Sequence, residues 1–194
     1  MEGLAVDGCT RCPALVDSRS RIVNGVGPTE AKLVLVGEAP GEQEDHTGEP
    51  FVGRSGSVLS EALDAAGIDR EDIRITNAVR CRPPENRNPR VEELDSCRDW
   101  LEAELYEIDP EVILAVGKVP ASHLLGRDVA VTAEAGAVDR IAIRDRRYPV
   151  VICVHPAAVL YDRSQEERLE NAIATAAREL GVTADDRQQR LGDF

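Results

Sequence analysis

A segment rich in glycine, proline and acidic residues directly follows an apolar run that is typical of a buried strand. The run covers residues 33–36, and the segment covers residues 37–53, with Glu38, Glu44 and Asp45 among its acids. Such a segment would build a poor core, but it can present carboxylates and exposed backbone groups at the carboxyl end of a sheet. Open α/β folds keep their sites at that edge. The segment therefore predicts one wall of a polar site.

Two further polar side chains follow apolar runs. Asn77 comes directly after residues 73–76, and its amide offers hydrogen-bond donors and an acceptor. His155 comes directly after residues 150–154 and precedes a proline, and a neutral imidazole there can donate one hydrogen bond. The simpler interpretations are a turn-forming asparagine and an ordinary loop histidine.

Four of the five cysteines form a pattern that suits metal binding. Cys9 and Cys12 make a C-x2-C pair, whereas Cys81 and Cys97 come much later in the chain. A cytoplasmic protein would not normally use them for disulfides. Four thiolates suit a zinc site or a 4Fe–4S cluster, but the dispersed spacing also fits unligated thiols, so spacing leaves the three open. Cys153 lies inside an apolar run and is predicted to be a buried thiol.

Strands that alternate with helices must position these residues. Residues 33–36, 73–76, 112–116 and 150–154 are runs rich in apolar, β-branched residues, and helical patterns fall between them. This order predicts an α/β protein, a three-layer α/β/α sandwich with a central four-stranded, mostly parallel sheet. Residues 129–147 carry only a weak β pattern.

The composition limits the cellular setting. The net charge of the 194 residues is −13, and only Lys32 and Lys118 are lysines among the 23 basic residues. An acidic, lysine-poor surface suits a salt-adapted protein, although an ordinary acidic protein is the simpler alternative. The charge argues against nucleic-acid binding by the whole surface, but not by a local basic face. No apolar run approaches the roughly 20 residues of a membrane span, and we find no secretory signal, so we expect a cytoplasmic protein.

One domain is expected over residues 1–181, followed by a flexible polar tail over residues 182–194. In the tail, Gln188, Leu191 and Phe194 fit the pattern Q-x-x-L-x-x-F, which resembles a peptide that binds sliding clamps. The two apolar side chains would fill a pocket while the glutamine hydrogen-bonds its rim. A plain tail is the alternative, because so short a pattern arises easily by chance.

Taken together, these motifs closely resemble the family 4 uracil-DNA glycosylases, the iron–sulfur type. The resemblance extends over nearly the whole chain and includes Cys9-Thr10-Arg11-Cys12, residues 37–53, residues 76–87, Cys97 and Val154-His155-Pro156-Ala157. It implies an enzyme that flips uracil out of single- and double-stranded DNA and hydrolyses its N-glycosidic bond, leaving an abasic site. It also implies a structural 4Fe–4S cluster on Cys9, Cys12, Cys81 and Cys97.

The resemblance further implies roles for individual side chains. His155 would donate a hydrogen bond to uracil as the base becomes anionic, and Glu38 would orient the attacking water, with Glu44 as its competitor. The uracil would contact the residues Ala39, Phe51, Asn77, Asn86 and His155. The family more often has serine at the position of Ala157, so one phosphate contact of the family would be missing here.

Several arginines gather around one loop of this acidic chain. Arg80, Arg82 and Arg87 are candidates for phosphate contacts, with charge balance against nearby glutamates as the alternative. Leu160 is our candidate for an apolar wedge that fills the gap left by a flipped base.

Two other functions stay open at this point. One is a related glycosylase with altered base specificity, and the other is a non-catalytic iron–sulfur module that binds DNA damage. For each of these functions we expect the protein to act as a monomer.

Overall fold

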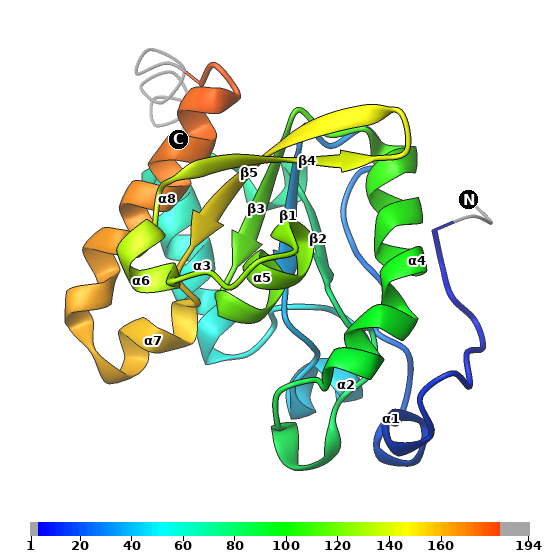
Figure 1. Ribbon diagram of the computed structural model, residues 1–194. Helices are drawn as coiled ribbons and strands as arrows, with labels where there is room; N and C mark the ends of the chain where they lie inside the picture. The colour runs from blue at the N-terminus through cyan, green and yellow to red at the C-terminus, as the bar shows by residue number, and fades with distance from the viewer. Residues whose placement is uncertain (1–3, 183–194) are drawn as a thin grey trace.

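The computed structural model describes residues 4–182, which are built around one five-stranded sheet (Figure 1). Its strands are β1 (Leu33–Gly37), β2 (Arg74–Asn77), β3 (Val112–Val116), β4 (Val138–Ile143) and β5 (Arg146–Cys153). Their order in the sheet is β2-β1-β3-β5-β4, and all neighbours are parallel except β4 and β5. The carboxyl ends of four strands therefore meet at one edge.

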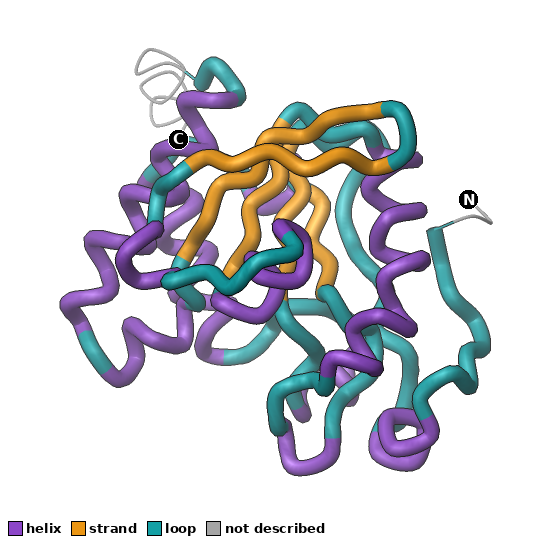
Figure 2. The backbone as a smooth tube through the Cα atoms, viewed as in Figure 1, coloured by secondary structure: helices purple, strands orange, loops and turns teal. Residues whose placement is uncertain are grey.

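Helices cover both faces of this sheet. The longer ones are α3 (Arg54–Ala65) and α8 (Glu166–Glu179) on one side, and α4 (Val91–Ile108) and α5 (Lys118–Leu125) on the other (Figure 1, Figure 2). The short elements are α1 (Pro13–Ser18), α2 (Glu42–Thr47), α6 (Val131–Glu134), α7 (Pro156–Tyr161), η1 (Arg70–Asp72), η2 (Pro84–Asn86) and η3 (Arg163–Gln165). Within residues 4–182, no helix has the length and apolarity needed to cross a membrane.

The alternation of side chains along β1 explains the three layers. All five residues of β1 are buried. Val34 and Val36 pack on the side of α4 and α5, whereas Leu33 and Leu35 pack on the side of α3 and α8. A strand that is apolar on both faces needs a helical layer on each. The predicted three-layer α/β/α class is confirmed.

The sheet has five strands where the sequence pattern indicated four. The additional strand, β4, forms an antiparallel hairpin with β5, and Arg144 in the turn has a φ of 55°. Because β4 lies at the edge of the sheet, only Ile141 and Ile143 of its side chains are buried. Two buried residues give little hydrophobic periodicity, which is why residues 129–147 show so weak a pattern.

A buried cluster of charges joins β2 to α4. The carboxylate of Glu104 is enclosed and accepts hydrogen bonds from Arg74 Nε, Thr76 Oγ1 and Arg80 Nη2, each at 2.8 Å. A Cβ atom at Gly25 would lie only 2.2 Å from Glu104 Oε1, so the backbone there closes over the carboxylate. One buried carboxylate thus provides the countercharge for two buried guanidinium groups.

Replacing Glu104 by glutamine should destabilise the fold strongly, because both guanidinium groups would stay buried without a countercharge. We expect the free energy of unfolding in urea to fall by about 3 kcal/mol. Glu102→Gln is the matched control on the same helix, since Glu102 pairs with Arg98 at the half-exposed surface. It should cost less than about 1 kcal/mol, and equal losses for the two variants would contradict this account.

Candidate active site

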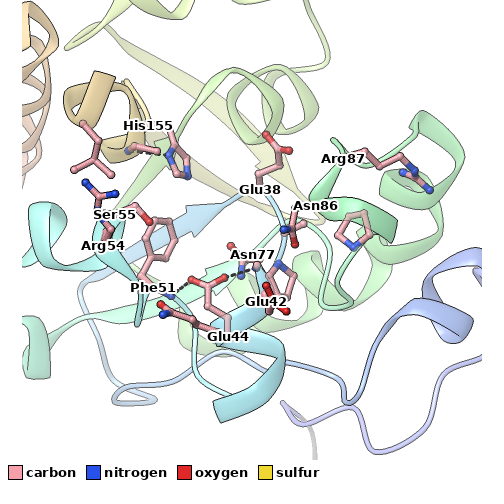
Figure 3. A pocket seen from close by; sticks show the side chains of 18 of the residues that line it. Glu38, Glu42, Glu44, Phe51, Arg54, Ser55, Asn77, Asn86, Arg87 and His155 are labelled. Atoms are coloured by element: carbon pink, nitrogen blue, oxygen red, sulfur yellow. Dashed lines mark hydrogen bonds between the residues drawn. The ribbon is translucent and has the colours of Figure 1, made fainter. Parts of the chain in front are cut away.

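One large cavity opens at the carboxyl ends of the parallel strands (Figure 3). It has a volume of about 700 Å³ and is lined by the acidic loop after β1, the end of β2, the loop around η2, and the starts of α3 and α7. Glu38, Asn77 and His155 line it and come from the ends of β1, β2 and β5. The parallel strands therefore bring together three side chains that lie far apart in the sequence.

The packing beside the cavity depends on the small size of Gly37. Gly37 and Asn77 are paired across β1 and β2. A Cβ atom on Gly37 would lie 2.3 Å from Asn77 Oδ1 and 2.6 Å from Cε2 of Phe51. Only glycine therefore allows the amide and the aromatic ring to pack against this strand end together.

Asn77 presents an unpartnered donor at this position. Its side chain is buried, with 3% of the residue exposed, and Nδ2 has no hydrogen-bond partner within the described part of the chain. A buried amide without a partner costs about 1–3 kcal/mol. The arrangement suits a ligand that offers a hydrogen-bond acceptor to Nδ2, while Oδ1 can accept from a neighbouring donor.

His155 caps the start of α7, and this contact sets its tautomer. The ring Nδ1 accepts a hydrogen bond from the backbone N–H of Ala157 at 3.1 Å, so a neutral ring carries its proton on Nε2. Burial lowers the pKa of His155 and so favours the neutral form. The ring lies beside that of Phe51, with 5.8 Å between centroids and 28° between planes. His155 therefore offers a neutral Nε2–H donor next to an aromatic face.

The two glutamates that compete for the catalytic role have different surroundings. Glu44 is held in place, because its carboxylate accepts hydrogen bonds from the backbone N–H groups of Gly41, at 2.8 Å, and Phe51 (Figure 3). The side chain of Glu38 has no hydrogen-bond partner among residues 4–182. Burial raises the pKa of both carboxyl groups, and in Glu44 the two backbone N–H groups oppose this rise. Glu38 is thus the carboxylate that is free to bind water.

Another acid of this loop, Asp45, has a structural role. Asp45 is buried and accepts hydrogen bonds from the backbone N–H groups of Ser20, at 2.8 and 2.9 Å, and Arg21, at 3.3 Å. It therefore fastens α2, beside the cavity, to the segment that follows α1.

The wall formed by the η2 loop contains the predicted residues Asn86 and Arg87. Arg82 Nε donates to Asn86 Oδ1 at 2.8 Å, and Asn86 has a φ of 53°, which asparagine tolerates better than most residues. Arg87 donates to both carboxylate oxygens of Glu93, at 2.8 and 2.6 Å. Both arginines already have partners within the protein, so a phosphate would share or replace these contacts.

The prediction that Arg80 contacts phosphate is wrong. Only 2% of Arg80 is exposed, and its guanidinium donates to the backbone oxygens of Leu4 and Trp100 and to the side chains of Asn24 and Glu104. A guanidinium that is enclosed by acceptors of its own chain cannot reach DNA. Its place in an arginine-rich loop did not reveal that this side chain points inward.

Three residues that the sequence reasoning missed also line the cavity. They are Arg54 and Ser55 at the start of α3 and Tyr161 at the end of α7. Tyr161 is 90% exposed, and the predicted wedge Leu160 is 36% exposed. An aromatic residue soon after the His-Pro pair, in a chain with 3% aromatic residues, was the available signal for Tyr161.

The four predicted metal ligands come together away from this cavity. Cys9, Cys12, Cys81 and Cys97 line one small pocket, although they come from the N-terminal segment, the start of α1, the loop after β2, and α4. Arg19 Nη1 donates to Cys81 Sγ at 2.8 Å. Burial raises the pKa of the Cys97 thiol to about 11.

Four thiols are the donor set of an iron–sulfur cluster and also of a zinc site. Among residues 4–182, no group of three or more histidine, cysteine, aspartate or glutamate side chains is arranged to hold one metal ion. The four thiols nevertheless line one pocket, and an iron–sulfur cluster would take one thiolate at each of its corners. Cys153 lies elsewhere, buried in the core beside α3 and α8, as predicted.

Comparison with known proteins identifies the family. The chain matches the Uracil DNA glycosylase superfamily over residues 24–180. It is 36% identical to the Type-4 uracil-DNA glycosylase of Archaeoglobus fulgidus, over 96% of this chain and 93% of the relative. It is 42% identical to the Type-4 uracil-DNA glycosylase of Thermotoga maritima, over 84% of this chain and 83% of the relative. The resemblance noted in the sequence is confirmed, and the chain belongs to the type-4 uracil-DNA glycosylases.

Proposed function

We propose that this protein is a DNA repair enzyme that flips uracil out of DNA and hydrolyses its N-glycosidic bond, leaving an abasic site. The observation that carries the proposal is the unpartnered Nδ2 of Asn77, buried beside Phe51 and His155 in the large cavity. An amide at such a position can pair with the O4 and N3–H edge of uracil. Phe51 supplies a flat apolar face on which the base can stack, and Ala39 and Asn86 also line the cavity.

The proposed reaction separates charge, and the two sides of the cavity are suited to opposite charges. As the C1′–N1 bond breaks, its electron pair moves onto the uracil ring, and the sugar becomes oxocarbenium-like. The neutral Nε2–H of His155 donates a hydrogen bond to the uracil oxygen that gains negative charge. The carboxylate of Glu38 stabilises the cationic sugar and orients a water. The water oxygen then bonds to C1′, and its proton passes to Glu38.

Glu44 has a supporting role in this proposal. Both of its carboxylate oxygens accept hydrogen bonds from the backbone of the loop, so it shapes the cavity and leaves the water to Glu38. The DNA strand would contact Arg82, Arg87 and the exposed Arg54, while Leu160 and Tyr161 would fill the space left by the flipped base.

A 4Fe–4S cluster on Cys9, Cys12, Cys81 and Cys97 is part of the proposal. When bound, it would join four separate segments of the chain and supply structural support without entering the reaction. Its position favours this role, because Cys81 follows Asn77 by four residues and the segment after α1 is fastened to α2 through Asp45.

The wider setting follows from the same proposal. We infer a cytoplasmic monomer that acts on single- and double-stranded DNA. The predicted clamp-binding residues Gln188, Leu191 and Phe194 lie outside the described residues, and their role stays a prediction that clamp pull-down with Phe194→Ala would test. A non-catalytic iron–sulfur module would not need the free carboxylate of Glu38 beside Asn77 and His155. A glycosylase with altered base specificity would excise another base instead, and oligonucleotides that carry other bases in place of uracil would test this.

The purified protein should convert a uracil-containing oligonucleotide into an abasic product that alkali cleaves. Because burial raises the pKa of Glu38, this side chain is protonated at a higher pH than an ordinary glutamate, and the single-turnover rate should begin to fall above the pH range in which an ordinary glutamate titrates. Glu38→Gln should lower the rate at neutral pH by about 100-fold and remove this dependence.

Glu49→Gln is the matched control, because Glu49 is an exposed acid of the same segment and does not line the cavity. It should keep both the rate and the pH dependence. No abasic product at stoichiometric enzyme would refute the proposed function, and an unchanged rate for Glu38→Gln would refute the role of Glu38.

The cluster has an optical signature that can be measured on the purified protein. We expect absorbance near ~400 nm that reductant bleaches. Cys97→Ala should abolish this band, since it removes one of four ligands, whereas Cys153→Ala should keep it, because Cys153 lies in the opposite part of the core. A colourless protein that contains zinc would contradict the cluster assignment.

A further inference from the structure

We propose that Arg70 is a positioning residue that holds the Phe51 ring in the orientation needed to stack on the base. This inference rests on the proposed function, because it assigns the ring to the uracil. Arg70 lies in η1, between α3 and β2, and is not among the residues that line the cavity. It would therefore act on the base only through Phe51.

The guanidinium of Arg70 donates hydrogen bonds to the backbone that carries the Phe51 ring. Its Nη2 donates to the backbone oxygens of Pro50, at 3.1 Å, and Phe51, at 2.9 Å. Its Nη1 donates to Ser60 Oγ at 3.1 Å, so α3 fixes the direction of the guanidinium. The planar fork of arginine suits such a set of divergent acceptors better than a single ammonium group does.

Phe51 needs this support because its backbone conformation is unfavourable. Its φ is 56°, in the left-handed region that aromatic residues rarely adopt. The backbone on both sides of the residue is held by charged side chains, since Glu44 accepts from its N–H and Arg70 donates to its carbonyl. A conformation of this kind persists only where the surroundings determine it.

The neighbouring glycines show how closely the ring position is defined. A Cβ atom on Gly56 would lie 1.8 Å from the carbonyl oxygen of Phe51, and one on Gly37 would lie 2.6 Å from its ring. The carbonyl and the ring are therefore confined from two sides. Loss of Arg70 Nη2 would leave the Phe51 carbonyl without its side-chain donor, and the backbone would then be free to relax toward a common conformation that turns the ring away from Asn77.

The two charged groups also support one another. Burial lowers the pKa of the Arg70 guanidinium, and the nearby negative charge of Glu44 opposes this effect by a smaller amount. In return, Arg70 favours the ionised form of Glu44, against the burial of that carboxyl group. The pair thus places a positive and a negative group on opposite ends of one strained residue.

A double-mutant cycle tests whether Arg70 acts through the ring. The probe is DNA that contains a 2′-fluorinated deoxyuridine, which can be flipped and bound but resists cleavage, and the same DNA with an abasic site is the reference. Arg70→Met keeps the aliphatic stem and removes the donors. It should weaken binding to the uracil probe by about tenfold, as should Phe51→Ala, since each removes the stacking contact. Neither should weaken binding to the abasic reference.

The double variant should bind the uracil probe with the same affinity as Phe51→Ala. Once the ring is absent, the hydrogen bonds from Arg70 no longer position a group that contacts the base. Additive losses, or equal losses on the abasic reference, would overturn the proposal. Glu71→Gln is the control for the surroundings of Arg70, because Glu71 is an exposed residue of the same short helix, and it should leave both affinities unchanged. If Arg70→Met does not fold, Arg70→Lys should show an intermediate loss confined to the uracil probe, and no such loss would equally overturn the proposal.

Failure of the proposed function would look different. In that case the unmodified protein would bind the uracil probe no better than the same DNA with thymine. A protein that prefers uracil and loses this preference with Phe51→Ala, but not with Arg70→Met, would retain the function and refute only the role of Arg70.

Discussion

The close approach of Gly37, Asn77 and Phe51 at the end of β1 is the constraint on which the rest of the site depends. The parallel register sets Gly37 opposite Asn77, and the missing Cβ lets the amide and the ring occupy the same small space. Phe51 holds its ring in this space with a backbone in the left-handed region, at a φ of 56°. Glu44 and Arg70 provide supporting contacts to this backbone. The positions of the amide and the ring are thus set by close packing at this strand end and by the two charged side chains that hold the backbone of Phe51.

Electrostatics then separates the two halves of the cavity. Burial disfavours the charged form of both His155 and Glu38, which makes the imidazole a neutral donor and the carboxyl group a stronger base than an ordinary glutamate. In a chain with a net charge of −13, Arg87 beside the cavity is paired with Glu93, and Arg80 is buried against Glu104. Base contacts and shape must therefore contribute more to DNA recognition than a broadly positive surface does.

Much of the site could be predicted because strand ends are readable in the sequence. Glu38, Asn77 and His155 each follow an apolar run, and parallel strands bring such residues to one edge. The sequence pattern could not show which way each side chain points. Arg80 and Arg82 are two residues apart, yet one is buried on Glu104 and the other lies beside the cavity. Arg70 was missed because it contacts backbone oxygens, and such contacts cannot be predicted from residue types. The strand β4 was missed because an edge strand buries few side chains.

The pairing of Asn77 with uracil is the central claim, and base choice tests it most directly. Asn77→Asp replaces the Nδ2 donor by an oxygen, which repels uracil O4 but can accept from the amino group of cytosine. Single-turnover excision should be measured on oligonucleotides that differ only in uracil or cytosine at one site. We expect the unmodified enzyme to act on uracil alone, and Asn77→Asp to lose at least about 100-fold of its uracil rate relative to its cytosine rate. An unchanged preference for uracil would show that Asn77 does not read the base.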